Sequence, residues 1–263
     1  MSDTTTPAMA RLAVHRQAEA RVLRDELLHH LWTEFPQHCI ALTDSGCRRC
    51  VEAAIDAGQH YGLTELAPLR VFLTMMVMLG SDFHRDVQLP WAVQALKRNR
   101  ALPQAQAMSR LAARTANELG TVAGEDGELY RRALLWVRSK RFDTLVTDYV
   151  THGAEGQHLW LRALYVTKYD SLGRGRVDGV IEAARAAAAD AGIQGPEGTM
   201  VFAGLMFLLG SGFAGDPFHP WVQPALQDAR ERPDTAASAR AFYDAAQAEL
   251  ERYLTLDRVM RRG

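Results

Sequence analysis

The chain has 263 residues, 48% of them hydrophobic, so it is long enough to bury a substantial core and is not a disordered protein. Its 30 Lys and Arg residues nearly balance its 31 Asp and Glu residues, which leaves a formal net charge of -1. This balance predicts no general affinity for nucleic acid or for an anionic membrane. We therefore expect any partner to be recognised through a local surface.

Neither the start of the chain nor its longest apolar run indicates export or membrane insertion. Residues 1–7 are polar and lack the apolar segment of a signal peptide. The run from Val71 to Leu79 is far shorter than the roughly 20 residues that span a bilayer. The three cysteines do not suit a disulfide framework, so a location in the reducing cytoplasm is expected.

Apolar residues recur at helical rather than alternating spacing, which predicts an all-α protein. An amphipathic helix is expected from about Ala10 to Phe35, because its leucines form one stripe. A second helix is expected from about Gly46 to His60, ending near Gly62, since glycine commonly follows the last turn of a helix.

A third, very apolar helix is predicted to start at Thr64, a residue type that caps helix N-termini, and to end at Gly80. Pro90 and Pro103 are expected in the first turns of two further helices, because those positions do not use a backbone N–H. A helix through Leu134 is expected to open the second half of the chain.

The sequence contains an internal repeat with a constant offset of 130 residues. The segment from Phe72 to Trp91 aligns without a gap on the segment from Phe202 to Trp221. The two copies share a motif, which we interpret as architectural: Gly80, Phe83, Asp86, Pro90 and Trp91 in the first, and Gly210, Phe213, Asp216, Pro220 and Trp221 in the second. The match predicts a duplicated unit of about a hundred residues, a normal domain size.

We expect the two units to pack as a pseudo-symmetric helical bundle. Residues 10–119 are assigned to the first unit and 129–257 to the second. The Gly- and acid-rich segment 120–128 is the expected linker, residues 1–9 are expected to be disordered, and residues 258–263 form a basic tail.

Asp86 and Asp216 are the ionisable residues that the two copies of the motif share. An aspartate before Pro90 or Pro220 can accept backbone N–H groups two or three residues further on, and we favour this role over catalysis. The paired tryptophans are expected to be buried beneath the loop, because large rings dominate core packing. His84 and His219 occupy different columns of the alignment, so we interpret both as solvated loop residues.

The spacing of Cys47 and Cys50, with Cys39 nearby, is compatible with a metal site. The corresponding residues in the second copy are Val177 and Val180, so the cysteines are interpreted as small apolar core residues. No metal and no cofactor is expected.

A charged surface near the middle of the chain is the expected partner-binding region. Two charged runs lie close together in the sequence there. Their residues are Glu125, Asp126, Arg131, Arg132, Arg138, Lys140 and Arg141. Such a patch would engage a protein partner by charge complementarity.

The segment Leu79 to Ala92 resembles a pattern, Gly-x-x-Phe-x-x-Asp-Pro-x-x-Pro-Trp-Ala, of helical proteobacterial proteins encoded beside type VI secretion effectors. Val87 replaces the first proline of the pattern in one copy, and Val222 replaces its final alanine in the other. The resemblance implies a cytoplasmic immunity protein that binds and neutralises a cognate toxin. An effector chaperone or adaptor, and an enzyme with Asp86, Asp216 or His219 between the units, stay open as alternatives, as does a homodimer.

Overall fold

The computed structural model describes residues 5–98 and 101–260, and these fold entirely into helices and loops, without a strand. Thirteen α-helices and one short 3₁₀ helix make up the described chain. The prediction of an all-α protein is confirmed. Within the same residues, no helix combines the length and the apolarity needed to cross a bilayer.

The first half of the chain contains five helices around one apolar core. They are α1 (Thr5–Glu34), α2 (Pro36–His60), α3 (Leu66–Leu79), α4 (Pro90–Arg98) and α5 (Gln104–Ala123). α3 lies at the centre, in contact with α1, α2 and α5. Its Phe72, Leu73 and Met76 are almost fully buried, and Leu27 of α1 and Cys50 of α2 pack into the same core.

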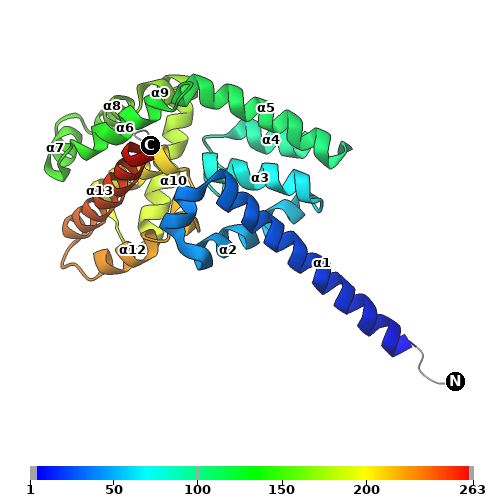
Figure 1. The fold of residues 1–263 in the computed structure, drawn as a ribbon. Coiled ribbons are helices and arrows are strands. Elements are labelled where there is room, and N and C mark those ends of the chain that lie inside the picture. Colours follow the sequence, from blue (N-terminus) through cyan, green and yellow to red (C-terminus); the bar gives the residue numbers. More distant parts are fainter. Residues whose placement is uncertain (1–4, 99–100, 261–263) are drawn as a thin grey trace.

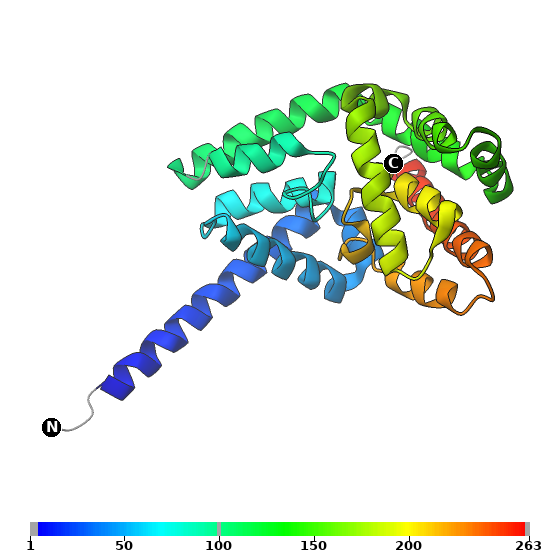
Figure 2. The same cartoon turned by 180° about the vertical axis from the view of Figure 1, so that it is seen from behind.

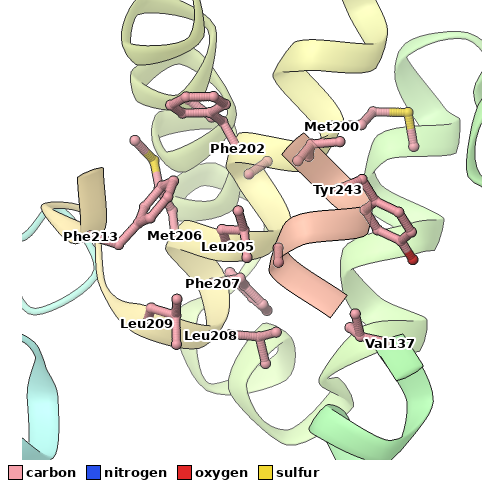
Figure 3. Close-up of a cluster of buried hydrophobic side chains, with 14 of the residues drawn as sticks. Val137, Met200, Phe202, Leu205, Met206, Phe207, Leu208, Leu209, Phe213 and Tyr243 are labelled. Carbon is pink, nitrogen blue, oxygen red and sulfur yellow. The ribbon is translucent and has the colours of Figure 1, made fainter. Parts of the chain in front are cut away.

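The second half contains eight helices and a larger core. They are α6 (Glu128–Arg138), α7 (Phe142–His152), α8 (Ala154–Leu164), α9 (Val166–Leu172), α10 (Arg174–Asp190), α11 (Gly195–Leu209), α12 (Val222–Arg230) and α13 (Thr235–Met260), with the 3₁₀ helix η2 (Phe213–Gly215) before α12. α11 is surrounded by α6, α7, α8, α10 and α13. Figure 3 shows side chains of α11 within the core, with Tyr243 of α13 and Val137 of α6 at the right of the view.

The two halves lie side by side, and α5 runs along the top of the first half and ends against the second (Figures 1 and 2). The end of α5 contacts α6 and α9 of the second half. Below this helix, the loop after α3 meets the loop after α11. The N-terminal part of α1 projects away from the remainder of the chain in both views.

The helices extend beyond several predicted boundaries. α1 begins at Thr5, so residues 5–9 of the segment predicted as disordered are helical, and residues 1–4 lie outside the described residues. α5 continues to Ala123 and α6 starts at Glu128. The linker predicted at 120–128 is therefore helical at both ends, and only residues 124–127 connect the two helices. α13 includes residues 258–260 of the predicted tail, and 261–263 are not described.

The predicted cap of α3 was wrong because a residue from another helix performs this function. α3 begins at Leu66, and the backbone N–H groups of Thr64 and Glu65 donate to Oε1 of Gln104, at 2.8 and 3.2 Å. Nε2 of Gln104 in turn donates to Oγ1 of Thr64 at 3.0 Å. An amide from α5 therefore satisfies the N–H groups that a helix start leaves free.

Other helix starts also differ from the sequence-based expectation. α2 begins at Pro36, ten residues before the predicted Gly46, and is interrupted at Thr43, which has a φ of 64°. Pro90 is the first residue of α4, as predicted, whereas Pro103 is the residue just before α5. Pro220 lies two residues before α12.

Candidate functional site

The two copies of the sequence motif form two loops that lie against each other. Each loop begins at a glycine that ends the preceding helix, Gly80 with a φ of 96° and Gly210 with a φ of 99°. A Cβ atom on Gly80 would lie 2.8 Å from the carbonyl oxygen of Leu209, and one on Gly210 would lie 3.1 Å from that of Leu79. Only glycine allows both this backbone conformation and this close approach.

Asp86 links its own loop to the other one. Its Oδ1 accepts from the backbone N–H of Gln88 at 2.8 Å and from the hydroxyl of Ser211, while its Oδ2 accepts from the backbone N–H of Ser211 at 2.8 Å. Nε2 of Gln88 also donates across the junction, to the carbonyl oxygen of Met206 at 2.8 Å. The Asp86 side chain is therefore buried and occupied by donors from both halves.

Asp216 makes the reciprocal set of contacts. Its Oδ1 accepts from the backbone N–H of Phe218, and its Oδ2 accepts from the backbone N–H of Ser81 in the first loop, each at 2.8 Å. Asp216 is 5% exposed and Asp86 is 4% exposed. The predicted bonds to N–H groups two residues further on are confirmed, and the bonds across the two loops are a further feature that the sequence did not indicate.

The aromatic residues of the motif occupy different depths. Phe83 and Phe213 are fully buried, and their rings lie 5.0 Å from Phe72 and 5.4 Å from Phe202, between centroids. These rings are the core anchors of the loops.

The motif tryptophans were expected to be buried beneath the loops, and this burial is only partial. Trp91 and Trp221 are only partly buried at the edge of the two cores. The guanidinium of Arg114 lies 5.7 Å from the Trp91 ring, and Trp221 stacks on Phe242 at 6.0 Å.

The loop histidines are packed rather than freely solvated, which corrects the sequence-based interpretation. The ring of His84 lies 5.6 Å from that of Tyr61 and 5.8 Å from that of Phe83, between centroids. Nδ1 of His219 lies 3.4 Å from the hydroxyl of Tyr253. Burial lowers the pKa of both imidazoles, although Asp216 opposes this effect at His219.

A cavity of about 510 Å³ opens beside the junction, between α2 and the two loops. Its polar lining includes Asp56, His60, Asp82, His84 and Arg85. Nη2 of Arg85 donates to Oδ1 of Asp82 at 2.8 Å, so two of these charges pair with each other. Asp86 and Asp216 are not part of the lining.

The polar character of this cavity belongs to the first half of the chain. Four of the five corresponding positions of the second half, 130 residues further on, carry alanine or glycine (Ala186, Gly212, Ala214 and Gly215), and the fifth, opposite His60, is Asp190. The cavity lining could have been predicted from the positions at which the first copy has a polar residue and the second copy has alanine or glycine.

The cysteines belong to the core of the first half. Cys39, Cys47 and Cys50 are at most 1% exposed. Burial raises the pKa of the Cys39 thiol to about 12 and also raises that of Cys50, which disfavours the reactive thiolate. Among the described residues, no group of His, Cys, Asp and Glu could hold a metal ion.

Lys168 is a partly buried cation near the junction that the sequence analysis did not identify. Its Nζ donates to the carbonyl oxygen of Phe207 at 2.6 Å and lies 5.3 Å from the centroid of the Phe207 ring. Burial lowers the pKa of this amine to about 8, and the nearby carboxylates of Asp86 and Glu118 oppose the shift. The side chain thus contributes a positive charge close to the Asp86 loop.

The predicted charged surface is partly engaged in contacts within the chain. Nη1 of Arg138 lies 3.1 Å from Oε2 of Glu251 on α13, and Nζ of Lys140 lies 4.8 Å from the centroid of the Trp136 ring. Nη2 of Arg131 donates to the backbone carbonyl of Asp126 at 3.4 Å. The most exposed members of the set are Glu125, Asp126, Arg132, Arg138 and Arg141.

Comparison with known protein families, with characterised proteins and with solved structures finds no match. The function therefore has to be inferred from the residues of the junction, the cavity and the charged surface themselves. The motif carboxylates hold two loops together, whereas the cavity of the first half and the charged surface around α6 present polar groups to open space.

Proposed function

We propose that the chain is a duplicated helical protein that binds and neutralises a cognate toxin. The duplication is supported by backbone geometry that recurs at the 130-residue offset. Gly62 and Gly192 have φ values of 77° and 78°, and the glycines that open the motif loops differ by only 3°. Leu63 and Ile193 donate backbone hydrogen bonds to residues at matching positions, at 2.9 and 2.8 Å.

The interruption of α2 supports the same relation. Thr43 has a φ of 64° and a ψ of 170°, and Gly173, at the corresponding position, has a φ of 74° and a ψ of 154°. Gly173 separates α9 from α10, so these two helices correspond to the two parts of α2. Within residues 5–98 and 101–260, Thr43 is the one non-glycine residue with a positive φ. This strained backbone conformation persists because the surrounding structure holds it in place.

The motif loops support an approximate twofold relation between the two units. Asp86 binds Ser211 while Asp216 binds Ser81, and this exchange of equivalent partners is what a twofold axis produces. The junction is buried, and each motif carboxylate accepts hydrogen bonds from both halves, which favours a rigid connection between them.

The observation that favours a binding protein over an enzyme is this use of the motif aspartates. The residues that the two copies share, and that resemble proteins encoded beside type VI secretion effectors, are engaged in holding the scaffold together. A rigid scaffold loses little conformational entropy when it binds, which favours tight inhibition of a partner. Recognition is then assigned to the surfaces that differ between the halves.

Two exposed arginines, one within α6 and one just before α7, are the proposed contact with an acidic surface of the toxin. Arg132 and Arg141 are exposed, whereas Arg138 is tied to α13. Reversing a charge at the rim of an interface changes the association rate most strongly. Arg132→Glu and Arg141→Glu should slow association with the toxin, whereas Arg49→Glu, at an exposed position on α2, serves as the matched control.

The direct test is co-expression with the product of the neighbouring gene. The proposal predicts rescue of cells from that product, a stable complex of the two purified proteins and loss of toxin activity in the complex. Normal toxin activity in a saturated complex would contradict neutralisation and would favour the adaptor, which releases its client.

The enzyme alternative now has a more specific location than the motif aspartates. The cavity with His60, His84 and Asp56 is where acid–base groups face open space. Turnover that is lost in a folded His84→Ala variant would favour an enzyme, and retention of toxin neutralisation by the same variant would favour the binding protein.

A further inference from the structure

α3 and α11 are the central helices of the two halves, but they are covered to different extents. Every residue of α11 from Gly198 to Leu209 is buried. On α3, Val71 and Thr74 are partly exposed and Met78 is 51% exposed. At the position that corresponds to Met78, Leu208 is only 7% exposed. One face of α3, defined by Val71, Thr74 and Met78 and hereafter called the α3 face, therefore has less cover than α11. Its contact with α1 is at Thr74, whose Oγ1 lies 3.0 Å from Nε2 of His30.

The cover over α11 comes from α6, α7 and α8. α6 and α7 both contact α11 and α13, and they bury Val137, Phe142 and Leu145 in the core. α7 is able to lie against α8 because the chain reverses at Gly153, which has a φ of 56° and a ψ of -136°. This conformation is accessible to glycine and strained for other residues.

The corresponding segment of the first half does not fold back. At the 130-residue offset, residues 5–22 correspond to residues 135–152, and Leu23 stands where the second half has Gly153. α1 continues through Leu23 as one helix, so residues 5–22, hereafter called the arm, point away from the α3 face of their own chain (Figures 1 and 2).

The arm is a helix without cover. Every residue from Ala13 to Glu19 is exposed, and Val14 and Val22 are 68% and 62% exposed. Val14, Ala18 and Val22 follow one another at intervals of four, so they line one side of the helix. A helix of this length is marginal in water by itself, since most helical stability in proteins comes from packing.

We propose that the chain forms a twofold dimer in which the arm of each copy packs on the α3 face of the other, where α6 and α7 cover α11 in the second half. The occupant is a second copy because the arm corresponds to residues 135–152, which form the last turn of α6 and all of α7, and because α1 continues straight through Leu23, so that the arm points away from its own chain. Each copy gives one arm and receives one, so the contact closes after two chains. The inference rests on the duplication within the proposed function.

The first experiment measures the mass of the full chain alone in solution, by sedimentation equilibrium. A dimer of twice 29.2 kDa is expected. Val14→Glu and Met78→Glu should each raise the dimer dissociation constant about tenfold or more, because each places a charge in the apolar contact. Leu159→Glu is the matched control, since Leu159 on α8 is 49% exposed but lies in the second half. A wild-type monomer at all concentrations, or a dimer that neither variant weakens, would overturn the proposal.

A second experiment separates exchange between chains from folding back. Val14→Cys and Met78→Cys are made in separate chains, mixed and treated with a flexible bismaleimide; the three native cysteines are buried and should not react. The proposal predicts a cross-linked product that contains one chain of each kind. A double variant that cross-links only within one chain would show an arm folded on its own α3 face, and it would refute the exchange. Because no toxin is present, failure here leaves toxin neutralisation untouched, and failed neutralisation leaves the dimer untouched.

Discussion

Replacing the motif aspartates by asparagine tests whether they are architectural. In Asp216→Asn, one oxygen that accepts a backbone N–H at 2.8 Å becomes an NH₂ group, which places two donors against each other. A hydrogen bond to a charged group contributes about 1.5–3 kcal/mol, and a buried N–H left unpaired adds a desolvation penalty. We therefore expect Asp216→Asn to lower the free energy of unfolding by about 2–4 kcal/mol.

Asp86→Asn should have an effect of the same size or larger, because its carboxylate also accepts from the Ser211 hydroxyl. For a chain of this size, a loss of about 3 kcal/mol corresponds to a fall in Tm of roughly 6–12 °C. Urea unfolding followed by circular dichroism gives the free energies. Asp82→Asn is the matched control in the same loop: its exposed ion pair with Arg85 should contribute about 0–1 kcal/mol.

The two substitutions should also be coupled, because both aspartates hold the same pair of loops. If the loops separate once either carboxylate is lost, the double variant loses less stability than the sum of the single variants. Wild-type stability in both single variants, combined with loss of toxin neutralisation, would refute the architectural role and would favour a chemical one.

Three further predictions concern other contacts of the fold. Gly80→Ala should lower the free energy of unfolding by about 2–4 kcal/mol, as measured by urea unfolding, and Gly62→Ala should lower it less. Both substitutions strain the backbone, but only at Gly80 would the added Cβ lie close to a carbonyl oxygen. Equal effects of the two substitutions would contradict this reason. Gln104→Ala should lower stability by about 1 kcal/mol through the loss of the α3 cap, whereas Gln106→Ala, an exposed position on the same helix, should have almost no effect. Lys168 has a pKa of about 8 in the fold and 10.5 outside it, so the folded chain releases its proton first as pH rises. The wild type should therefore gain stability relative to Lys168→Met between pH 8 and 10.5, by at most about 1.4 kcal/mol per pH unit; a pH-independent difference in urea unfolding would contradict the burial of this charge.

Local chemistry explains why some features were predictable from the sequence. Helical periodicity and the glycines that end α2 and α3 act over a few residues, so Gly62 and Gly80 were correctly expected at helix ends. The bond from Asp86 to the backbone N–H of Gln88 is of the same kind. Each of these features depends on neighbours in the chain, and the sequence alone contains that information.

Contacts between distant residues were not predictable in the same way. Ser81 donates to Asp216 across 135 residues, and Gln104 caps a helix that begins 38 residues earlier. Ser, Gln and Asp occur at many surface positions, so their type alone does not identify a distant partner. The partial burial of Lys168 is a further case, since lysine is mostly exposed and the contact of its amine with Phe207 depends on the packing of α9 and α11.

The comparison of Gly153 with Leu23 shows how one residue can account for the main difference between the halves. The two positions correspond at the 130-residue offset, and both were visible in the sequence. Glycine permits the reversal that folds α7 over α8, whereas leucine at the same φ and ψ would add strain of the order of 1–3 kcal/mol, which favours a continuous helix at Leu23. A straight α1 follows from this difference, and with it an arm and an α3 face that are both uncovered in one chain. Substituting a single helix-breaking residue could thus turn an internal contact into a contact between molecules, which is the physical basis of the proposed dimer.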